Sequence, residues 1–308
     1  MLQAFAAAMG GSMREALVHD PLMRPITARY AICPGGTAII ESAQACGLTL
    51  MSVRERDPLR ATTWGVGELL LAALSSGCRQ FVIGLGGSGT SDCGRGMLSS
   101  LAARLTDGRL SALPHHPLIR QSHFILASDV QNPLYGPTGA ARIYGSQKGA
   151  TPDMQELLDQ QARDFALRSA HLLGHDYSQC PGSGAAGGLG YAFLQYLGAE
   201  AQPGADILLR SISFPTLLHD ASLVITGEGS ADRQTLMGKL PMRVLQQSRL
   251  HSQVPVWLIA GRVSDREALL KAGFQHVDCI NPPGIPSQEA LRPEVAKRHL
   301  AQWASLHF

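Results

Sequence analysis

Gln80-Phe-Val-Ile-Gly-Leu-Gly-Gly-Ser-Gly-Thr-Ser-Asp-Cys-Gly94 is the stretch that decides the fold class. The apolar run 81–85 is short and contains β-branched residues, which predicts a buried strand, and 97–105 predicts a helix. In a strand–turn–helix unit, backbone N–H groups at the helix start can hold an anion, and glycines let the anion approach the main chain. The turn therefore predicts a phosphate or carboxylate site. The alternative is a tight turn without a ligand, and the glycine spacing fits neither GxGxxG nor GxxxxGK[ST].

The same alternation of strands and helices continues along the chain. Strands are predicted at 25–32, 37–40, 123–130, 223–226, 254–260 and 277–280. Helices are predicted at 68–75, 151–171, 191–197, 240–249, 265–272 and 288–306, and Thr151 before Pro152 is a suitable N-cap. This rhythm indicates an α/β protein with a mainly parallel sheet and helices on both faces. At 308 residues the chain is long enough for two domains or one large α/β unit.

The composition narrows the function classes. Apolar residues make up 45 % and charged residues 16 %, and the net charge is only +2 with neutral histidines. No block of like charges occurs, so neither a nucleic acid nor a membrane is expected as a partner. The six cysteines lie far apart without a CxxC pair, which favours reduced thiols in a cytoplasmic protein over a zinc site or a disulfide framework. The apolar residues 1–11 are too short to span a bilayer and lack the basic start of a signal peptide; they predict part of a helix.

Carboxylates and amides follow several predicted strands, where α/β proteins bind their ligands. Asp129 could orient or deprotonate a substrate hydroxyl, or hold a metal, and an Asx-type cap of the next turn is the alternative. Asn132 follows in the same loop. Glu228 and Asp232 suit Mg²⁺, although exposed loop carboxylates are common without one. Capping of the following helix is the role that the sequence favours for Asp92.

Two lysines and a second glycine-rich turn complete the set of candidates. Lys148 and Lys239 each neighbour a glycine, where a lysine can act as a mobile charge on phosphate; a solvated surface lysine is the alternative. The turn 181–190 precedes a helix, and its Gly184, Gly187 and Gly188 could form a second anion cradle. Ser183 lacks the preceding strand of a nucleophile elbow. Without a hydrolytic triad, this inventory fits phosphoryl transfer to a small polar substrate best, because that chemistry needs positioning and charge neutralisation.

Seven ordered motifs resemble the bacterial glycerate kinase family of the glycerate 2-kinase type. They are Glu55-Arg-Asp-Pro-Leu59 with Thr62-Thr-Trp-Gly-Val-Gly-Glu68, Gly84-Leu-Gly-Gly-Ser-Gly-Thr-Ser-Asp92, Ser128-Asp-Val-Gln-Asn-Pro-Leu134, Gly136-Pro-Thr-Gly-Ala-Ala141, Gln147-Lys-Gly-Ala-Thr-Pro152, Gly182-Ser-Gly-Ala-Ala-Gly-Gly-Leu-Gly190, and Thr226-Gly-Glu-Gly229 with Asp232, Gln234-Thr235 and Gly238-Lys239. The resemblance implies transfer of the γ-phosphoryl group of ATP, with Mg²⁺, to D-glycerate in the cytoplasm, at the 2-hydroxyl. A homo-oligomer is compatible with it.

The resemblance also implies two α/β domains with the site between them. The expected Rossmann-like domain comprises residues 75–130 and 217–308, and the second, smaller α/β domain comprises residues 10–74 and 131–216. The expected roles are phosphate or carboxylate binding for Gly86, Gly87, Ser88, Asp92, Asn132, Gly184, Gly187 and Gly188, metal binding for Glu228 and Asp232, and catalysis for Asp129, Lys148 and Lys239.

One departure from the family pattern opens a rival interpretation. The family begins upstream with a strand and a helix, and this sequence starts after the segment that would hold them. An inactive, N-terminally truncated remnant is therefore one alternative to a working glycerate kinase. A kinase for another small hydroxy acid is the other.

Overall fold

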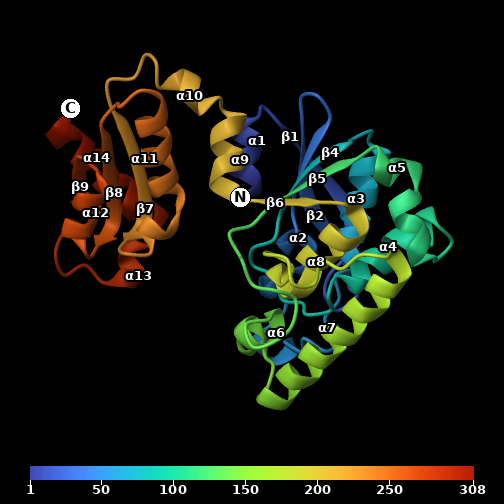
Figure 1. Cartoon of the computed structure of the whole chain (residues 1–308). Coiled ribbons are helices and arrows are strands. Elements are labelled where there is room, and N and C mark those ends of the chain that lie inside the picture. The colour runs from blue at the N-terminus through green and yellow to red at the C-terminus, as the bar shows by residue number, and fades with distance from the viewer. The chain divides into compact units, whose positions relative to one another are not determined.

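The computed structural model describes all residues from Met1 to Phe308, which divide into two compact units. Unit 1 is Met1–Ile207 and unit 2 is Leu208–Phe308. In Figure 1 unit 1 runs from blue to yellow and unit 2 from orange to red. No helix in the structure has both the length and the apolar character needed to cross a bilayer.

Unit 1 is built on a six-stranded sheet whose strands lie side by side in chain order. Neighbouring strands are antiparallel from β1 to β3 and parallel from β3 to β6. Consecutive strands are usually neighbours in such sheets, whether a hairpin or a helical crossover connects them. The strands are β1 (Ser12–His19), β2 (Pro25–Cys33), β3 (Thr37–Glu41), β4 (Gln80–Gly84), β5 (His123–Ala127) and β6 (Glu200–Gln202).

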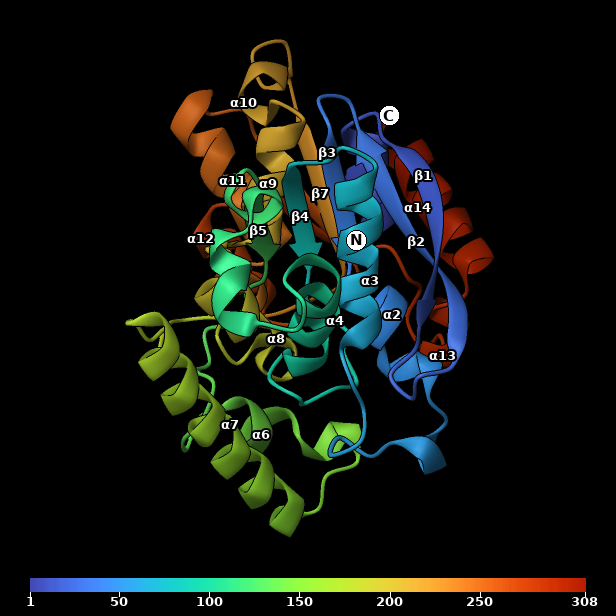
Figure 2. The same cartoon turned by 90° about the vertical axis from the view of Figure 1, so that its right-hand side faces the viewer.

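Helices pack on this sheet and on one another, as Figure 2 shows for α3 and α4. The core lies between sheet and helices, and at its centre Phe81 of β4 stacks on Phe124 of β5 with ring centroids 4.8 Å apart. The helices are α1 (Leu2–Ala8), α2 (Ala43–Cys46), α3 (Trp64–Ser75), α4 (Arg95–Leu105), α5 (Pro117–Arg120), α6 (Ala140–Tyr144), α7 (Pro152–Leu173) and α8 (Ala185–Leu197), followed by α9 (Gly204–Ser211), which runs across the boundary between the units.

Unit 2 has its own three-stranded parallel sheet in the order β7-β8-β9. Its core includes Leu258 of β8, Val277 of β9 and Leu269 of α12, all fully buried. The elements are α10 (Phe214–Leu217), β7 (Val224–Ala231), α11 (Leu240–His251), β8 (Val256–Val263), α12 (Arg266–Ala272), β9 (His276–Cys279), α13 (Ser287–Ala290) and α14 (Pro293–His307).

The predicted α/β class is confirmed, with a mainly parallel central sheet and a second, smaller parallel sheet. Two strands were not predicted from the sequence, β1 and β6. The predicted grouping of 75–130 with 217–308 differs from the observed division: β4 and β5 pair with β3 and β6 in the first sheet. Strands that follow one another in the chain usually lie side by side, even where helices connect them, and β4 and β5 keep to that rule.

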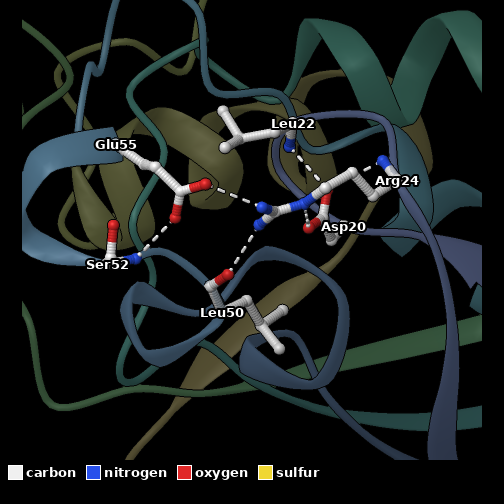
Figure 3. A network of polar contacts seen from close by, with 6 residues as sticks. All are labelled: Asp20, Leu22, Arg24, Leu50, Ser52 and Glu55. Atoms are coloured by element: carbon white, nitrogen blue, oxygen red, sulfur yellow. Dashed lines mark hydrogen bonds and ion pairs between the residues drawn. The ribbon is translucent and has the colours of Figure 1, made fainter.

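A polar network centred on Arg24 fixes the loop that leads towards α3 (Figure 3). The Arg24 guanidinium contacts Asp20 Oδ2 at 2.6 Å and Glu55 Oε1 at 2.8 Å, and donates to the Leu50 carbonyl. Burial alone would raise the pKa of Asp20, but hydrogen bonds from Arg24 and from the Leu22 backbone outweigh it and lower that pKa. The motif containing Glu55 is thus held to the β1–β2 hairpin by charge-assisted bonds.

Candidate active site

The glycine-rich loop after β4 is held in place by main-chain hydrogen bonds to the end of α2 and to the residues directly after it. Leu48 N donates to Gly87 O at 2.9 Å, and Gly89 N donates to Cys46 O at 2.8 Å. Gly87 has a φ of +78°, a conformation that glycine adopts without strain. A Cβ at Gly86 would meet nothing within 4 Å, so the main chain there borders open space. The loop therefore presents accessible backbone beside a rigid support.

Lys148 reaches this loop from far along the chain. Its ammonium donates to Ser88 Oγ at 3.2 Å and to the Thr90 carbonyl at 2.7 Å, and only 2 % of the residue is exposed. The left-handed Gly149, with a φ of +93°, passes so close to Arg56 that a Cβ would lie 2.5 Å from the Arg56 carbonyl oxygen. This close approach explains the glycine after Lys148: it lets the chain turn back and bury the lysine.

Burial lowers the pKa of Lys148 to about 8, because the charged ammonium loses its hydration shell. Both oxygens that accept its hydrogen bonds are neutral. An ammonium in such surroundings gains most from an anionic ligand, since an opposite charge restores the stabilisation lost on burial. This is the electrostatic signature of an anion site.

A cavity of about 270 Å³ joins these groups. It brings together the exposed backbone of Gly86 and Gly87, the ammonium-bearing Lys148, and side chains from three further segments of unit 1. Its lining consists of Leu48, Leu85, Gly86, Gly87, Ser88, Val130, Tyr144, Gln147, Lys148 and Ala186. Perturbed titratable groups in such a concave site mark it as the candidate functional site of unit 1.

The second glycine-rich turn forms one wall of this cavity and packs tightly against the first loop. Ala186, Gly187 and Gly188 are all left-handed, and Ala186 borders the cavity. A Cβ at Gly187 would lie 2.0 Å from the Thr90 carbonyl oxygen, and one at Gly188 would lie 2.8 Å from Cys93 Cα. The Gly184 amide donates to the Asn132 carbonyl. These glycines serve close packing between loops, and ligand binding by them stays a prediction.

The structure gives different positions to the polar residues predicted at the site. The Asp92 carboxylate accepts hydrogen bonds from the amides of Gly94 and Gly96 and from Thr63, so it ties the start of α4 to α3 and serves the capping role that the sequence favours. Asn132 accepts from the Tyr144 hydroxyl at 2.7 Å and organises its own loop. Asp129 is exposed at the end of β5 and keeps its carboxylate available.

In unit 2 the predicted metal ligands lie in the last part of β7 and directly after it, and one hydroxyl holds them together. Thr235 is fully buried; its Oγ1 donates to Glu228 Oε1 at 2.6 Å and accepts from the Asp232 amide at 3.0 Å. The other Glu228 oxygen lies 3.7 Å from Lys239 Nζ, and Asp232 Oδ1 accepts from the Gln234 amide. The carboxylates of Glu228 and Asp232 and the ammonium of Lys239 thus lie along the connection from β7 to α11, which the buried Thr235 hydroxyl holds in shape.

Comparison with known proteins now decides the family. The glycerate kinase family model matches residues 1–306, almost the whole chain. The chain belongs to the glycerate kinase family. A glycerate kinase of Bacillus subtilis (strain 168) is 40 % identical over an aligned region that covers 94 % of this chain and 80 % of that protein. The glycerate 2-kinase of Escherichia coli (strain K12) is 40 % identical, with coverage of 86 % and 74 %.

The fold agrees with this membership of the glycerate kinase family. A crystal structure from Salmonella typhimurium LT2 assigned to glycerate kinase 2 superposes with a TM-score of 0.75 at 30 % identity, covering all of this chain and 87 % of that one. The family resemblance inferred from the seven motifs is therefore confirmed, and the chain is a kinase. Thr63, Ala186 and Thr235 lie inside the family motifs, but the sequence assigned them no role of their own, and Tyr144 was not singled out. Each contributes through a contact between segments distant in the chain or across a turn.

Proposed function

We propose that this chain phosphorylates the 2-hydroxyl of D-glycerate with ATP and Mg²⁺. Its membership of the glycerate kinase family supports the reaction class. The observation that carries the proposal is the buried ammonium of Lys148 beside the open backbone of Gly86 and Gly87. Both the carboxylate of glycerate and the phosphates of ATP are anions that such a site can bind.

In unit 1 we assign binding and charge neutralisation to the cavity. The backbone of Gly86 and Gly87 and the hydroxyl of Ser88 would orient an anionic group, and Lys148 would neutralise its charge. Asp129, exposed at the end of β5, would orient the acceptor hydroxyl and accept its proton. Phosphoryl transfer needs mainly this positioning and electrostatic stabilisation, because little covalent chemistry falls to the protein.

In unit 2 the donor set suits a hard cation. Carboxylate oxygens are the ligands that Mg²⁺ prefers. Thr235 holds Glu228 in place through one hydrogen bond, so the other lone pairs of the carboxylate stay available to a metal ion. Glu228 and Asp232 would hold Mg²⁺, whose charge neutralises phosphate oxygens when it is bound. Lys239, at the start of α11, would add a mobile positive charge beside Glu228.

The direct test is ADP release from MgATP in the presence of D-glycerate, followed with a coupled assay. The ³¹P spectrum of the product identifies the hydroxyl: a phosphate on C2 couples to one methine proton and gives a doublet, whereas one on C3 couples to two methylene protons. Folded protein that releases no ADP with D-glycerate refutes the proposal. Activity with another hydroxy acid alone would favour the kinase for a different substrate.

Two variants test the assigned sites separately. Gly86→Val should fold normally, because a Cβ there meets no neighbour, yet it would fill the space where a ligand approaches the main chain. We expect a large loss of kcat/KM with an unchanged melting temperature. Glu228→Gln should raise the Mg²⁺ concentration needed for half-maximal activity, and the exposed Asp220→Asn is its matched control. Unchanged Mg²⁺ dependence in Glu228→Gln would exclude Glu228 as a ligand.

A further inference from the structure

Unit 2 contains a cluster of two histidines and one aspartate that the kinase reaction does not use. His276 and Asp278 lie two residues apart on β9, so their side chains share one face of the sheet. His307, at the end of α14, joins them. One ligand atom from each of the three side chains lies within 4.8 Å of the other two.

Hydrogen bonds orient the two groups that face each other most closely. His307 Nδ1 lies 2.8 Å from the Trp303 carbonyl, which can only accept, so Nδ1 carries a proton and donates. This leaves Nε2 of His307 facing Asp278 Oδ2 at 3.5 Å. Either a proton or a metal ion between Nε2 and this carboxylate oxygen would satisfy both atoms, so the pair can act as two ligands of one ion.

Outer contacts support Asp278 as a ligand. Its Oδ1 accepts from Arg266 Nη2 at 3.0 Å, and its Oδ2 accepts from the Trp303 indole N–H at 3.0 Å. Each contact uses one lone pair, so Oδ2 keeps another for a ligand bond. Hydrogen-bonded carboxylates, and histidines whose second nitrogen donates to a carbonyl, are the outer shell typical of protein metal sites.

Aromatic rings flank the cluster and limit its motion. Trp257 packs edge-on against His276 with centroids 4.8 Å apart, and Trp303 stacks on His307 at 4.5 Å. The side chains of Asp278 and His307 keep 18 % and 26 % of their surface exposed, so water and ions have access. The site is thus walled by apolar surface but open on one side.

We propose that His276, Asp278 and His307 bind a first-row transition-metal ion such as Zn²⁺, with a fourth position open to water. Imidazole nitrogens and one carboxylate oxygen are a donor set for Zn²⁺, and three protein ligands leave a tetrahedral site incomplete. Ligand bonds of about 2.0–2.2 Å place tetrahedral ligand atoms about 3.4 Å apart. The ligand atoms, now within 4.8 Å of one another, therefore need to approach by little more than about 1 Å when the ion binds, which side-chain rotation can supply. The oxygen-preferring Mg²⁺ of the kinase reaction would not compete well here.

The test is a Zn²⁺ titration of the full chain without a polyhistidine tag, by calorimetry after dialysis against a chelator. We expect one saturable equivalent of Zn²⁺ and a higher melting temperature in its presence. His276→Asn, Asp278→Asn and His307→Gln should each weaken Zn²⁺ binding about tenfold or more. Cobalt substitution should give visible absorption of a four- or five-coordinate ion that is lost in the same variants.

Two control variants separate this cluster from adventitious ligands. His251→Gln removes an exposed histidine from α11, and Cys279→Ser removes the exposed thiol next to Asp278; both should bind Zn²⁺ like the parent chain. Melting temperatures measured in chelator show whether each variant is folded. The proposal is overturned if the parent chain binds no Zn²⁺ saturably, or if binding survives in the three cluster variants. Failure of Zn²⁺ binding would leave the kinase proposal untouched, because the two are measured independently.

Discussion

Replacing Lys148 shows separately how much its burial lowers the stability of the fold and how much its charge contributes to kinase activity. The substitution Lys148→Met keeps the length of the side chain and removes the charge. The difference between the ordinary pKa of 10.5 and the folded value of about 8 corresponds to about 3 kcal/mol of destabilisation at neutral pH. Methionine leaves Ser88 Oγ and the Thr90 carbonyl without their hydrogen-bond donor. This loss costs about 1–2 kcal/mol, because water from the adjoining cavity can take over part of the donor's role. We therefore expect the variant to be more stable than the parent by about 1–2 kcal/mol at pH 7.

The pH dependence of this stability difference shows whether the buried charge of Lys148 is its cause. Below pH 8 the lysine is charged in both the folded and the unfolded chain, so the full cost of burying it is present. Between pH 8 and 10.5 the folded chain loses this proton first, and the parent gains stability as the pH rises. The advantage of Lys148→Met should shrink over this window, whereas the exposed Lys271→Met should show no such trend.

Two measurements are needed, one for stability and one for activity. Urea-dependent hydrogen exchange of the buried amides in α4 reports on unit 1 itself. Kinase activity should fall about 100-fold or more, as when a single charge-stabilising donor is removed from an active site. A variant that loses stability at pH 7, by an amount that stays constant from pH 8 to 10, would refute the reasoning, because the ammonium would then stabilise the fold.

Three further predictions concern packing, catalysis and the Arg24 network. Gly187→Ala should lower the free energy of unfolding, measured in urea, by about 3 kcal/mol or more, because its Cβ would collide with a carbonyl oxygen and its φ is +69°. Gly174→Ala is the control: Gly174 is also left-handed but has no neighbours, so this change should cost only about 1 kcal/mol. Asp129→Asn should leave stability within about 0.5 kcal/mol and lower kcat about 100-fold; full activity would remove Asp129 from the mechanism. Arg24→Ala should lower the melting temperature at pH 7. This loss should shrink as the pH falls below the ordinary pKa of Asp20 and disappear below the lowered pKa of the folded chain, because the carboxylate contributes stability only while it is ionised. An equal loss in acid would show that Arg24 acts through packing instead.

The sequence predicted the elements whose signals are local. Thr151 does cap α7, accepting from the Met154 amide, and the run 81–85 does contain a buried strand, β4, which ends at Gly84. β1 escaped prediction because it is an edge strand with little burial: Leu17 and Met13 face solvent, so the alternation of apolar and polar residues is lost. β6 escaped because it is three residues long.

The sequence was enough to predict which residues belong to the site, but not which of them contact one another. The contact between Lys148 and Ser88 spans 60 positions of the chain and exists only once the sheet has formed. The glycines at 187 and 188 look like a ligand cradle in the sequence, yet packing against the neighbouring loop already requires them. The histidine–aspartate cluster was missed because its third member comes from α14, with no spacing rule linking it to β9.

The left-handed run at the start of α8 also limits how this chain can drift during evolution. Every replacement of Gly187 adds a Cβ, and a Cβ there would lie 2.0 Å from a main-chain oxygen that cannot move without disturbing the contact of Lys148. Ala186, by contrast, already carries a Cβ at a φ of +53°. Ala186 can therefore be replaced by glycine or asparagine, whereas Gly187 cannot be replaced. Neighbouring codons in one turn should thus accumulate substitutions at very different rates, for a reason that is purely steric.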